Sequence, residues 1–441
     1  MFKYLLYFSL LSPFLGISQQ QIKGVFSPAS DFKATMLYQL SAGNAIYVSY
    51  GSVNAEGEMQ IDLGVSVPAG LYKLVYALPQ SEHNFEFIYN GTVAVEFNFD
   101  AETGVEFINS KENQLLHAYT QSMAVAQNEL VQLYAEPTID TLIYKRRAQK
   151  MDSLQNSYEA LSKGTIAAHF ITASSPYIPT TVETANSYIS NVKAHYFEGI
   201  NFQDAILQSS NFIVDKSLEY ILQMHFSETP SFQEYQANID AVNNVLESTK
   251  LSYQLTTLNT LREAFITAER DALAVYLTKT YVLPLAKQLN DTELVTSLKA
   301  FMRIAVGEKA PDFEIENPSI SSKKTLYDLD GATTFLLIFW SSDCSHCLKE
   351  LPEVHAYISN HPEKNIEVVA IGIETDSKQW AETIKPWSGF MHSIAEGKWE
   401  HAITKTYDIK ATPTYFVLDA SKVITAKPYL LKDLKMVLDQ K

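Results

Sequence analysis

Both cysteines of the 441-residue chain lie three residues apart, in the segment SSDCSHCLKELP that contains Cys344 and Cys347. Two thiols at this spacing could form a structural disulfide, supply half of a metal site, or act as a redox pair. A bridge between them closes almost no loop, so it would constrain the unfolded chain very little. A structural zinc site needs about four ligands, and only His346 lies between the cysteines. The spacing therefore favours a redox pair without metal.

The segments around the cysteines predict where the thiols lie in the fold. The apolar stretch TFLLIFW at 334–340 is typical of a buried strand, and a helix is expected from about Cys344 to Asn360. Free N–H groups and a partial positive charge at a helix N-terminus stabilise a thiolate. We therefore expect Cys344 to attack and Cys347 to resolve the mixed disulfide. His346 would favour the thiolate through a hydrogen bond or positive charge; the alternative is an ordinary solvated histidine.

The remainder of the C-terminal part alternates strands and helices from residue 303 onward. A second buried strand is predicted at 366–373, followed by a helix from about Ser377. The stretches TYFVLD and KVITAK at 414–427 predict a hairpin, and a closing amphipathic helix follows. Apolar strands flanked by helices indicate a sheet covered on both faces. The sequence thus predicts a C-terminal α/β domain over 303–441.

The first 302 residues predict a different organisation. Short alternating apolar segments between residues 22 and 100 indicate a small antiparallel β-sandwich or barrel, assigned to 19–105. Helical spacing dominates 106–302 and predicts three apolar stripes. The first comprises Leu115, Tyr119, Met123, Leu130 and Leu133, the second Met151, Leu154, Tyr158 and Leu161, and the third Leu251, Leu255, Leu258, Leu261 and Phe265. The scattered histidines of this region show no ligand spacing, so we interpret them as ordinary surface or core histidines.

The N-terminus predicts export. Lys3 precedes an apolar run, and Gly16 and Ser18 supply small residues for cleavage after Ser18, so residues 1–18 are expected to be a signal peptide. No later segment is apolar enough to span a membrane. We therefore expect an exported protein, in the periplasm of a Gram-negative bacterium. The net charge of −16, of which −4 belongs to 303–441, argues against a nucleic-acid partner bound through a basic surface.

Several motifs of the C-terminal part occur together and in order. These motifs are GEKAPDF at 307–313, FW before the cysteines, ELP at 350–352, VVAIGIETD at 368–376 and ATPTYFVLD at 411–419. With them, residues 303–441 resemble the TlpA/ResA family of exported thiol-disulfide oxidoreductases. The resemblance implies a thioredoxin-like fold, no cofactor beyond the redox-active disulfide, and attacking and resolving roles for Cys344 and Cys347. The front part resembles, less specifically, the small β domain that precedes such domains in Bacteroidota proteins.

The same resemblance implies roles for four further residues. Glu350 matches the family's acid beneath the cysteine pair, where burial would raise its pKa and let it relay protons to the inner thiol. Pro413 matches the cis-proline opposite the active site, and Thr412 precedes it. The backbone of this pair would contact an extended substrate segment. Trp340 would pack under the turn and belong to the substrate-binding part of the site.

The residue before the first cysteine departs from the family pattern. Relatives usually carry tryptophan or another uncharged residue where this chain has Asp343. As an N-cap, Asp343 would satisfy amide donors and steady the helix. As a negative charge beside Cys344, it would oppose formation of the thiolate. The direction of electron flow therefore stays open at this point.

Four functions are compatible with the sequence, and a reductase of disulfides in exported proteins is favoured. A membrane thiol donor would recharge it, and apocytochrome c is one substrate implied by the resemblance. A peroxidase is disfavoured because Leu337 occupies the position where the peroxiredoxin signature has proline. A binding or scaffold protein, in which the front part does the biological work, is the main alternative. An isomerase is the fourth, if the front part dimerises.

Overall fold

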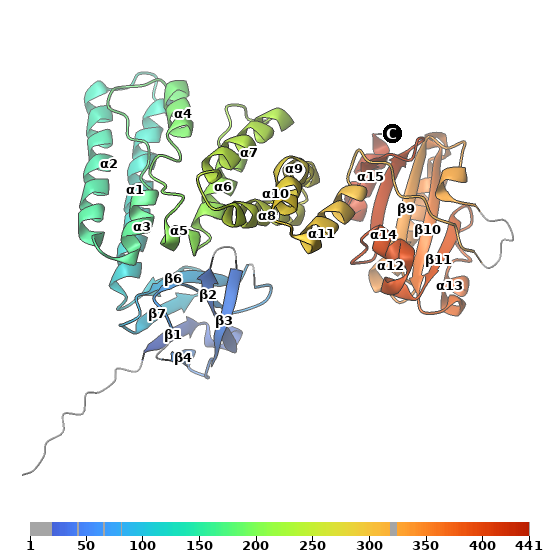
Figure 1. Cartoon of the computed structure of the whole chain (residues 1–441), viewed down its shortest axis with the longest axis horizontal. Coiled ribbons are helices and arrows are strands. Elements are labelled where there is room, and N and C mark those ends of the chain that lie inside the picture. Colours follow the sequence, from blue (N-terminus) through green and yellow to red (C-terminus); the bar gives the residue numbers. More distant parts are fainter. Residues whose placement is uncertain (1–19, 42–43, 65–66, 81, 318–323, 441) are drawn as a thin grey trace, which may run out of the picture. The chain divides into compact units, whose positions relative to one another are not determined.

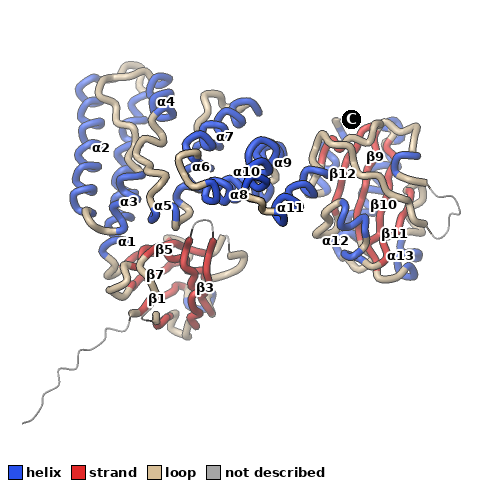
Figure 2. Tube along the Cα trace, in the orientation of Figure 1, coloured by secondary structure: helices blue, strands red, loops and turns tan. Residues whose placement is uncertain are grey.

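The computed structural model describes residues 20–41, 44–64, 67–80, 82–317 and 324–440 (Figure 1). The expected signal peptide at 1–18 lies outside the described residues. The chain forms two compact units, one comprising Met1–Glu234 and Asn244–Tyr253, the other Tyr235–Asn243 and Gln254–Lys441. Strands occur near the start and the end of the described chain, with a helical stretch between them (Figure 2). This order of β, helical and α/β parts confirms the predicted fold class.

The N-terminal part contains two four-stranded sheets, ordered β4-β1-β7-β8 and β3-β2-β5-β6. Its strands are β1 (Gln21–Ser27), β2 (Ala34–Ser41), β3 (Asn44–Ser52), β4 (Glu58–Asp62), β5 (Gly70–Val75), β6 (Asn84–Tyr89), β7 (Val95–Asp100) and β8 (Gly104–Phe107). Alternate residues of both sheets enter one core; Met59 and Ile61 of β4 do so while their neighbours face solvent. The prediction of an antiparallel sandwich is wrong for one pair, because β1 and β7 run parallel. A hairpin would make such a pair antiparallel, but the chain between β1 and β7 is long enough to return to the other end of the sheet and pair in parallel.

The middle of the chain is helical. Its helices are α1 (Lys111–Val131), α2 (Thr141–Ser162), α3 (Ile166–Ala173), α4 (Ala185–Ala194), α5 (Ala205–Gln208), α6 (Phe212–Gln223), α7 (Phe232–Leu246), α8 (Leu251–Thr267), α9 (Asp271–Leu277), α10 (Leu283–Gln288) and α11 (Thr292–Arg303). Asp140 caps α2 by accepting hydrogen bonds from the backbone N–H groups of Leu142 and Ile143. No helix in the described ranges is long and apolar enough to cross a membrane.

The C-terminal part is a five-stranded sheet in the order β11-β10-β9-β12-β13. The strands are β9 (Thr334–Trp340), β10 (Ile366–Glu374), β11 (Met391–Glu396), β12 (Thr414–Asp419) and β13 (Ile424–Ala426); the helices are α12 (Ser345–Asn360), α13 (Ser377–Thr383), α14 (Ala402–Thr406) and α15 (Leu431–Asp439). β9, β10 and β11 run parallel, and β12 and β13 form the predicted antiparallel hairpin. Helices cover both faces of the sheet, with α12 and α15 on one face and α14 on the other.

The central strand β9 is buried along its whole length because both of its faces are covered. Leu337 and Phe339 enter one core, which α14 and the 304–329 segment complete. Ile338 and Trp340 enter the other, together with residues of α12 and α15. The strand therefore ends at a fixed point in the middle of the sheet, and the cysteine segment begins there.

Candidate active site

The turn between β9 and α12 carries the cysteine pair, as predicted. Cys344 is the N-cap of α12, and its Sγ accepts a hydrogen bond from the backbone N–H of Cys347 at 3.2 Å. The helix N-terminus thus points its free N–H groups at the sulfur of Cys344. The expectation of Asp343 as the N-cap is wrong, since the cysteine itself occupies that position.

The two thiols lie in different environments. Cys344 is half-buried, whereas Cys347 is fully buried, and both are free thiols in this structure. Burial pushes the pKa of Cys344 upward, but hydrogen bonds from the Cys347 thiol, from the side chain of Thr412 and from the backbone N–H groups of Cys347 and His346 outweigh burial. The pKa of Cys344 therefore lies below its ordinary value. Burial, with the neighbouring Cys344 thiol, raises the pKa of Cys347 to about 12. Cys344 is therefore suited to attack, and Cys347 is suited to stay protonated until it resolves the mixed disulfide.

This asymmetry predicts selective alkylation. Iodoacetamide reacts with thiolates, and a thiol of pKa about 12 is only about 10⁻⁵ ionised near pH 7. In the reduced protein, Cys344 should be modified near neutral pH while Cys347 stays unmodified, because it ionises only as the pH approaches its raised pKa. Fragmentation mass spectrometry of the peptide that contains both cysteines locates the label. Equal labelling of the two thiols near pH 7 would contradict the assignment.

The Thr412–Pro413 loop lies directly against the attacking cysteine. The peptide bond between Thr412 and Pro413 is cis, as the family resemblance implies. The thiol of Cys344 donates a hydrogen bond to the backbone carbonyl of Thr412 at 3.3 Å. Both loop residues are partly exposed. Their backbone is therefore available beside the sulfur that would react.

Glu350 has a partner that the sequence did not reveal. Tyr415, on β12, donates its hydroxyl hydrogen to Oε2 of Glu350 at 2.7 Å. The tyrosine ring is buried, and burial followed by the hydrogen bond to Glu350 raises the pKa of Tyr415 far above its ordinary range; Cys347 and Cys344 contribute further. Glu350 lies three residues after Cys347 on α12, so the two share one side of the helix. Glu350 thus lies on the side of α12 that carries the inner thiol, and Tyr415 fixes its carboxylate.

The other predicted site residues are placed differently. His346 is exposed, and its backbone N–H, rather than its ring, contributes to the stabilisation of Cys344. The proposed role of its side chain stays a prediction. Trp340 is fully buried and packs edge-on against Trp387, with 5.0 Å between the ring centroids. We therefore assign Trp340 to packing beneath the turn rather than to contact with substrate.

Two carboxylates hold the turn that precedes Cys344. Glu374, at the end of β10, is buried and accepts hydrogen bonds from the backbone N–H and the hydroxyl of Ser342 at 2.6 and 2.9 Å. Asp343 pairs with Lys398, whose Nζ lies 2.8 Å from Oδ2 of Asp343. The ion pair offsets the negative charge that Asp343 places next to Cys344. Sequence reasoning missed both Glu374 and Lys398, which are far from the cysteines along the chain.

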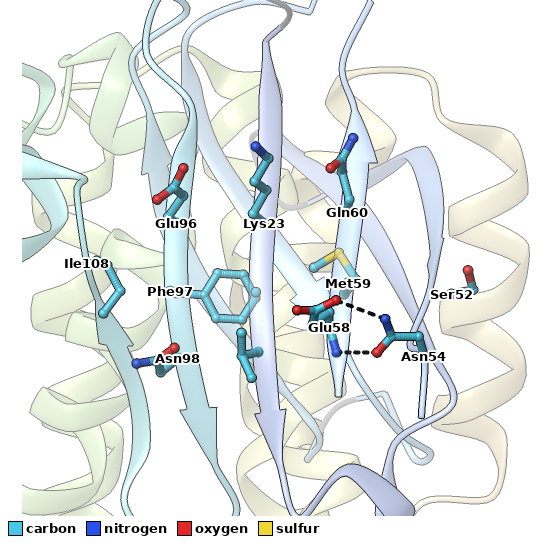
Figure 3. Close-up of a pocket in the computed structure, with 12 residues that line it drawn as sticks. Lys23, Ser52, Asn54, Glu58, Met59, Gln60, Glu96, Phe97, Asn98 and Ile108 are labelled. Atoms are coloured by element: carbon cyan, nitrogen blue, oxygen red, sulfur yellow. Dashed lines mark hydrogen bonds between the residues drawn. The ribbon is translucent and has the colours of Figure 1, made fainter. Parts of the chain in front are cut away.

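A hollow on the N-terminal part is a second place where a ligand could lie. It measures about 590 Å³ and lies on the solvent face of the sheet that contains β1, β4 and β7 (Figure 3). Side chains of Lys23, Gln60 and Glu96 line it, and Asn54 exchanges hydrogen bonds with Glu58. This set offers polar contacts but no nucleophile beside a base. Among the described residues, no group of three or more His, Cys, Asp and Glu side chains is arranged to hold a metal.

Comparison with known proteins agrees with the chemistry of the turn. Residues 306–427 match the model of the AhpC/TSA family. The C-terminal part is an AhpC/TSA-family, thioredoxin-like domain. It resembles a thiol-disulfide oxidoreductase ResA of Bacillus cereus, with 28% identity over 127 residues, which are 28% of this chain and 70% of ResA. The thioredoxin-like protein YneN of Bacillus subtilis (strain 168) is 28% identical over 29% of this chain and 74% of its own length.

A solved structure gives a further comparison for this domain. A domain of a possible thiol-disulfide isomerase from Cytophaga hutchinsonii ATCC 33406 is 34% identical. The comparison covers 31% of this chain and 91% of that domain, with a TM-score of 0.28. The family match and the ResA comparison identify the C-terminal part as a thiol-disulfide oxidoreductase domain with a CxxC pair, Cys344 and Cys347.

Proposed function

We propose that this chain is an exported oxidoreductase that reduces disulfides of periplasmic proteins through Cys344 and Cys347. The observation that carries the proposal is the asymmetry of the pair. Cys344 is accessible, with its pKa lowered by the hydrogen bonds that outweigh its burial, and Cys347 is buried, with a pKa of about 12. An attacking thiolate beside a protonated resolving thiol is what two-step disulfide exchange requires.

The reaction proceeds in two exchanges. The Cys344 thiolate attacks one sulfur of the substrate disulfide, and the other substrate sulfur leaves as a thiolate that takes up a proton. Cys347 then loses its proton and displaces the remaining substrate sulfur from Cys344. The Cys344–Cys347 disulfide forms, the substrate gains two electrons and two protons, and no cofactor is needed. A thiol donor, in our proposal one in the membrane, returns the pair to the reduced state.

The direction of electron flow is proposed from the charges near the pair. A strong oxidant of this class stabilises its reduced form through a very acidic thiolate. Here Asp343 directly precedes Cys344. The carboxylate of Asp343 disfavours a thiolate on Cys344, although the ion pair with Lys398 offsets part of this effect. The buried environment of Cys347 also disfavours ionisation. The lowered pKa of Cys344 acts in the opposite direction. We propose that Asp343 and the buried Cys347 outweigh it and make the couple reducing.

The substrates and the location are proposed from separate observations. Relatives such as ResA are named thiol-disulfide oxidoreductases, which supports disulfide-containing substrates. The N-terminal residues 1–18 support export to the periplasm of a Gram-negative bacterium. Exported proteins with disulfides, apocytochrome c among them, are the proposed partners.

A turnover assay tests the proposed function. With dithiothreitol as donor, the mature protein should accelerate reduction of insulin disulfides, which precipitates the free B chain and is followed by turbidity. The matched control is Cys344→Ser, which keeps the buried Cys347 but lacks the attacking thiol. A rate equal to that of dithiothreitol alone would refute the proposal.

A binding or scaffold function of the front part is the second candidate. The hollow beside β1, β4 and β7 is the observation that favours it, since its polar lining could contact a partner. This function would leave the cysteine pair unused, so the insulin assay separates the two. A peroxidase is not supported, because Leu337 is a buried residue of β9 where that signature needs proline.

A further inference from the structure

Trp399 is an exposed aromatic side chain in the domain that carries the cysteine pair. It is 45% exposed, whereas the other tryptophans of the chain, Trp340, Trp380 and Trp387, are at most 5% exposed. Tryptophan is among the residues most enriched at the positions that dominate the binding energy of protein interfaces. A single exposed apolar residue is common on protein surfaces and needs no special explanation. Whether Trp399 has a role therefore depends on where it lies.

The turn that carries Trp399 is attached to the active-site turn. Lys398, the preceding residue, binds the carboxylate of Asp343 at 2.8 Å, and Asp343 directly precedes Cys344. The backbone N–H of Gly397 donates to the carbonyl of Glu374 at 2.9 Å. The side chain of Glu374 in turn holds Ser342. The turn that carries Trp399 is therefore tied to the segment that leads into the attacking cysteine.

The backbone of this turn adopts a conformation that is unfavourable for one of its residues. Gly397 has a φ of 95° and Lys398 a φ of 51°, so two consecutive residues are left-handed. Glycine tolerates this region, but a residue with a Cβ does so at a cost. The hydroxyl of Thr404 donates to the carbonyl of Lys398 at 3.0 Å and helps to hold the turn. Unfavourable backbone of this kind is concentrated at functional sites.

The charged residues next to Trp399 in the chain are paired. Lys398 pairs with Asp343, and Glu400 pairs with Lys405 at 2.6 Å. Leu348, which follows Cys347, is also 42% exposed. A substrate segment that extends from Cys344 on the side of Asp343 would pass over this part of the surface. Apolar neighbours would bury surface against the indole, whereas polar neighbours would gain little.

We propose that Trp399 is a specificity-determining residue that packs against the polypeptide segment beside the substrate cysteine. The domain would then prefer disulfides whose cysteines have apolar neighbours, as exposed by incompletely folded proteins. This inference rests on the proposed function. It assigns Trp399 no part in the exchange itself.

The test uses two disulfide-linked peptide dimers of equal length. One carries leucine and phenylalanine beside its cysteine, and the other carries serine and glycine. Single-turnover reduction of each by the reduced full chain is measured for the wild type and for Trp399→Ala. Met436→Ala is the matched control, because Met436 is 55% exposed on α15 and lies outside the active-site segments.

Trp399→Ala should slow reduction of the apolar dimer about tenfold or more and change the rate with the polar dimer less than about twofold. The polar dimer also reports that the variant is folded and active, and Trp399→Phe should recover part of the loss. Equal rates of Trp399→Ala and wild type on the apolar dimer, or equal losses on both dimers, would overturn the inference alone. If the wild type reduces neither dimer, the proposed function itself has failed.

Discussion

Replacing Cys347 with serine is expected to convert the protein into a trap for its substrates. Cys344 remains accessible and keeps the backbone N–H bond to its sulfur, so it can still attack. The serine hydroxyl cannot displace the substrate sulfur, so the mixed disulfide should accumulate instead of resolving. In a periplasmic extract, Cys347→Ser should form covalent complexes with cysteine-containing proteins, and reductant should release them. Mass spectrometry of the released proteins identifies the substrates.

Cys344→Ser is the control for this trap. The remaining Cys347 is fully buried, and burial raises its pKa, so it should capture few proteins or none. Capture by Cys347→Ser that does not exceed capture by Cys344→Ser would show that the domain does not exchange disulfides with proteins. The scaffold function would then take precedence.

Replacing Glu350 with glutamine is expected to slow turnover by at least about tenfold, in the range that general acid–base groups contribute. Cys347 must lose its proton to resolve the mixed disulfide, and burial, the largest cause of its raised pKa, disfavours that loss near neutral pH. Glu350 lies three residues after Cys347 on α12 and is fixed by Tyr415, so we expect it to accept that proton. Glutamine keeps an oxygen for the tyrosine but cannot take up a proton. Insulin reduction measured between about pH 5 and pH 8 checks the prediction.

Tyr415→Phe is the companion variant for Glu350. It removes only the hydroxyl that donates to the carboxylate, so Glu350 stays in the chain but loses its positioning contact. A smaller loss of rate with a changed pH profile is expected, whereas the glutamine variant should lose the greater part of the rate. Wild-type rates for Glu350→Gln at every pH would leave Glu350 with a structural role only.

The local features of the site could be predicted from the sequence. The apolar run at 334–340 coincides with β9, because a strand buried on both faces has a continuous apolar composition. The cysteine pair follows it at the start of α12, and the hairpin β12–β13 lies where alternating segments flank a short turn. Each of these features depends on residues that are neighbours in the chain.

The contacts that complete the site could not be predicted in this way. Tyr415 reaches Glu350 from a different strand, Lys398 reaches Asp343 from a turn after β11, and Glu374 reaches Ser342 from β10. These pairs are 65, 55 and 32 residues apart, and only the order of strands in the sheet brings them together. The parallel pairing of β1 with β7 was missed for the same reason.

Helical periodicity predicted which faces of the helices in the middle part are buried, and it failed at some helix ends. Leu255, Leu258 and Leu261 are buried as their stripe predicted, but Leu161 and Leu251 are 68% and 41% exposed. Leu161 lies in the last turn of α2, and Leu251 is the first residue of α8. A helix end extends past the neighbours that cover its centre, so a stripe overestimates burial there.

The reduction potential of the Cys344–Cys347 couple tests the central claim most directly. It is measured by equilibrating the full chain with defined ratios of oxidised and reduced dithiothreitol or glutathione and quantifying the free thiols. The asymmetric pair, with Asp343 beside the attacking cysteine, predicts a reducing couple with a potential near thioredoxin's, about −270 mV. A potential near about −120 mV would make the protein an oxidant, and the absence of any Cys344–Cys347 disulfide would contradict the redox account altogether.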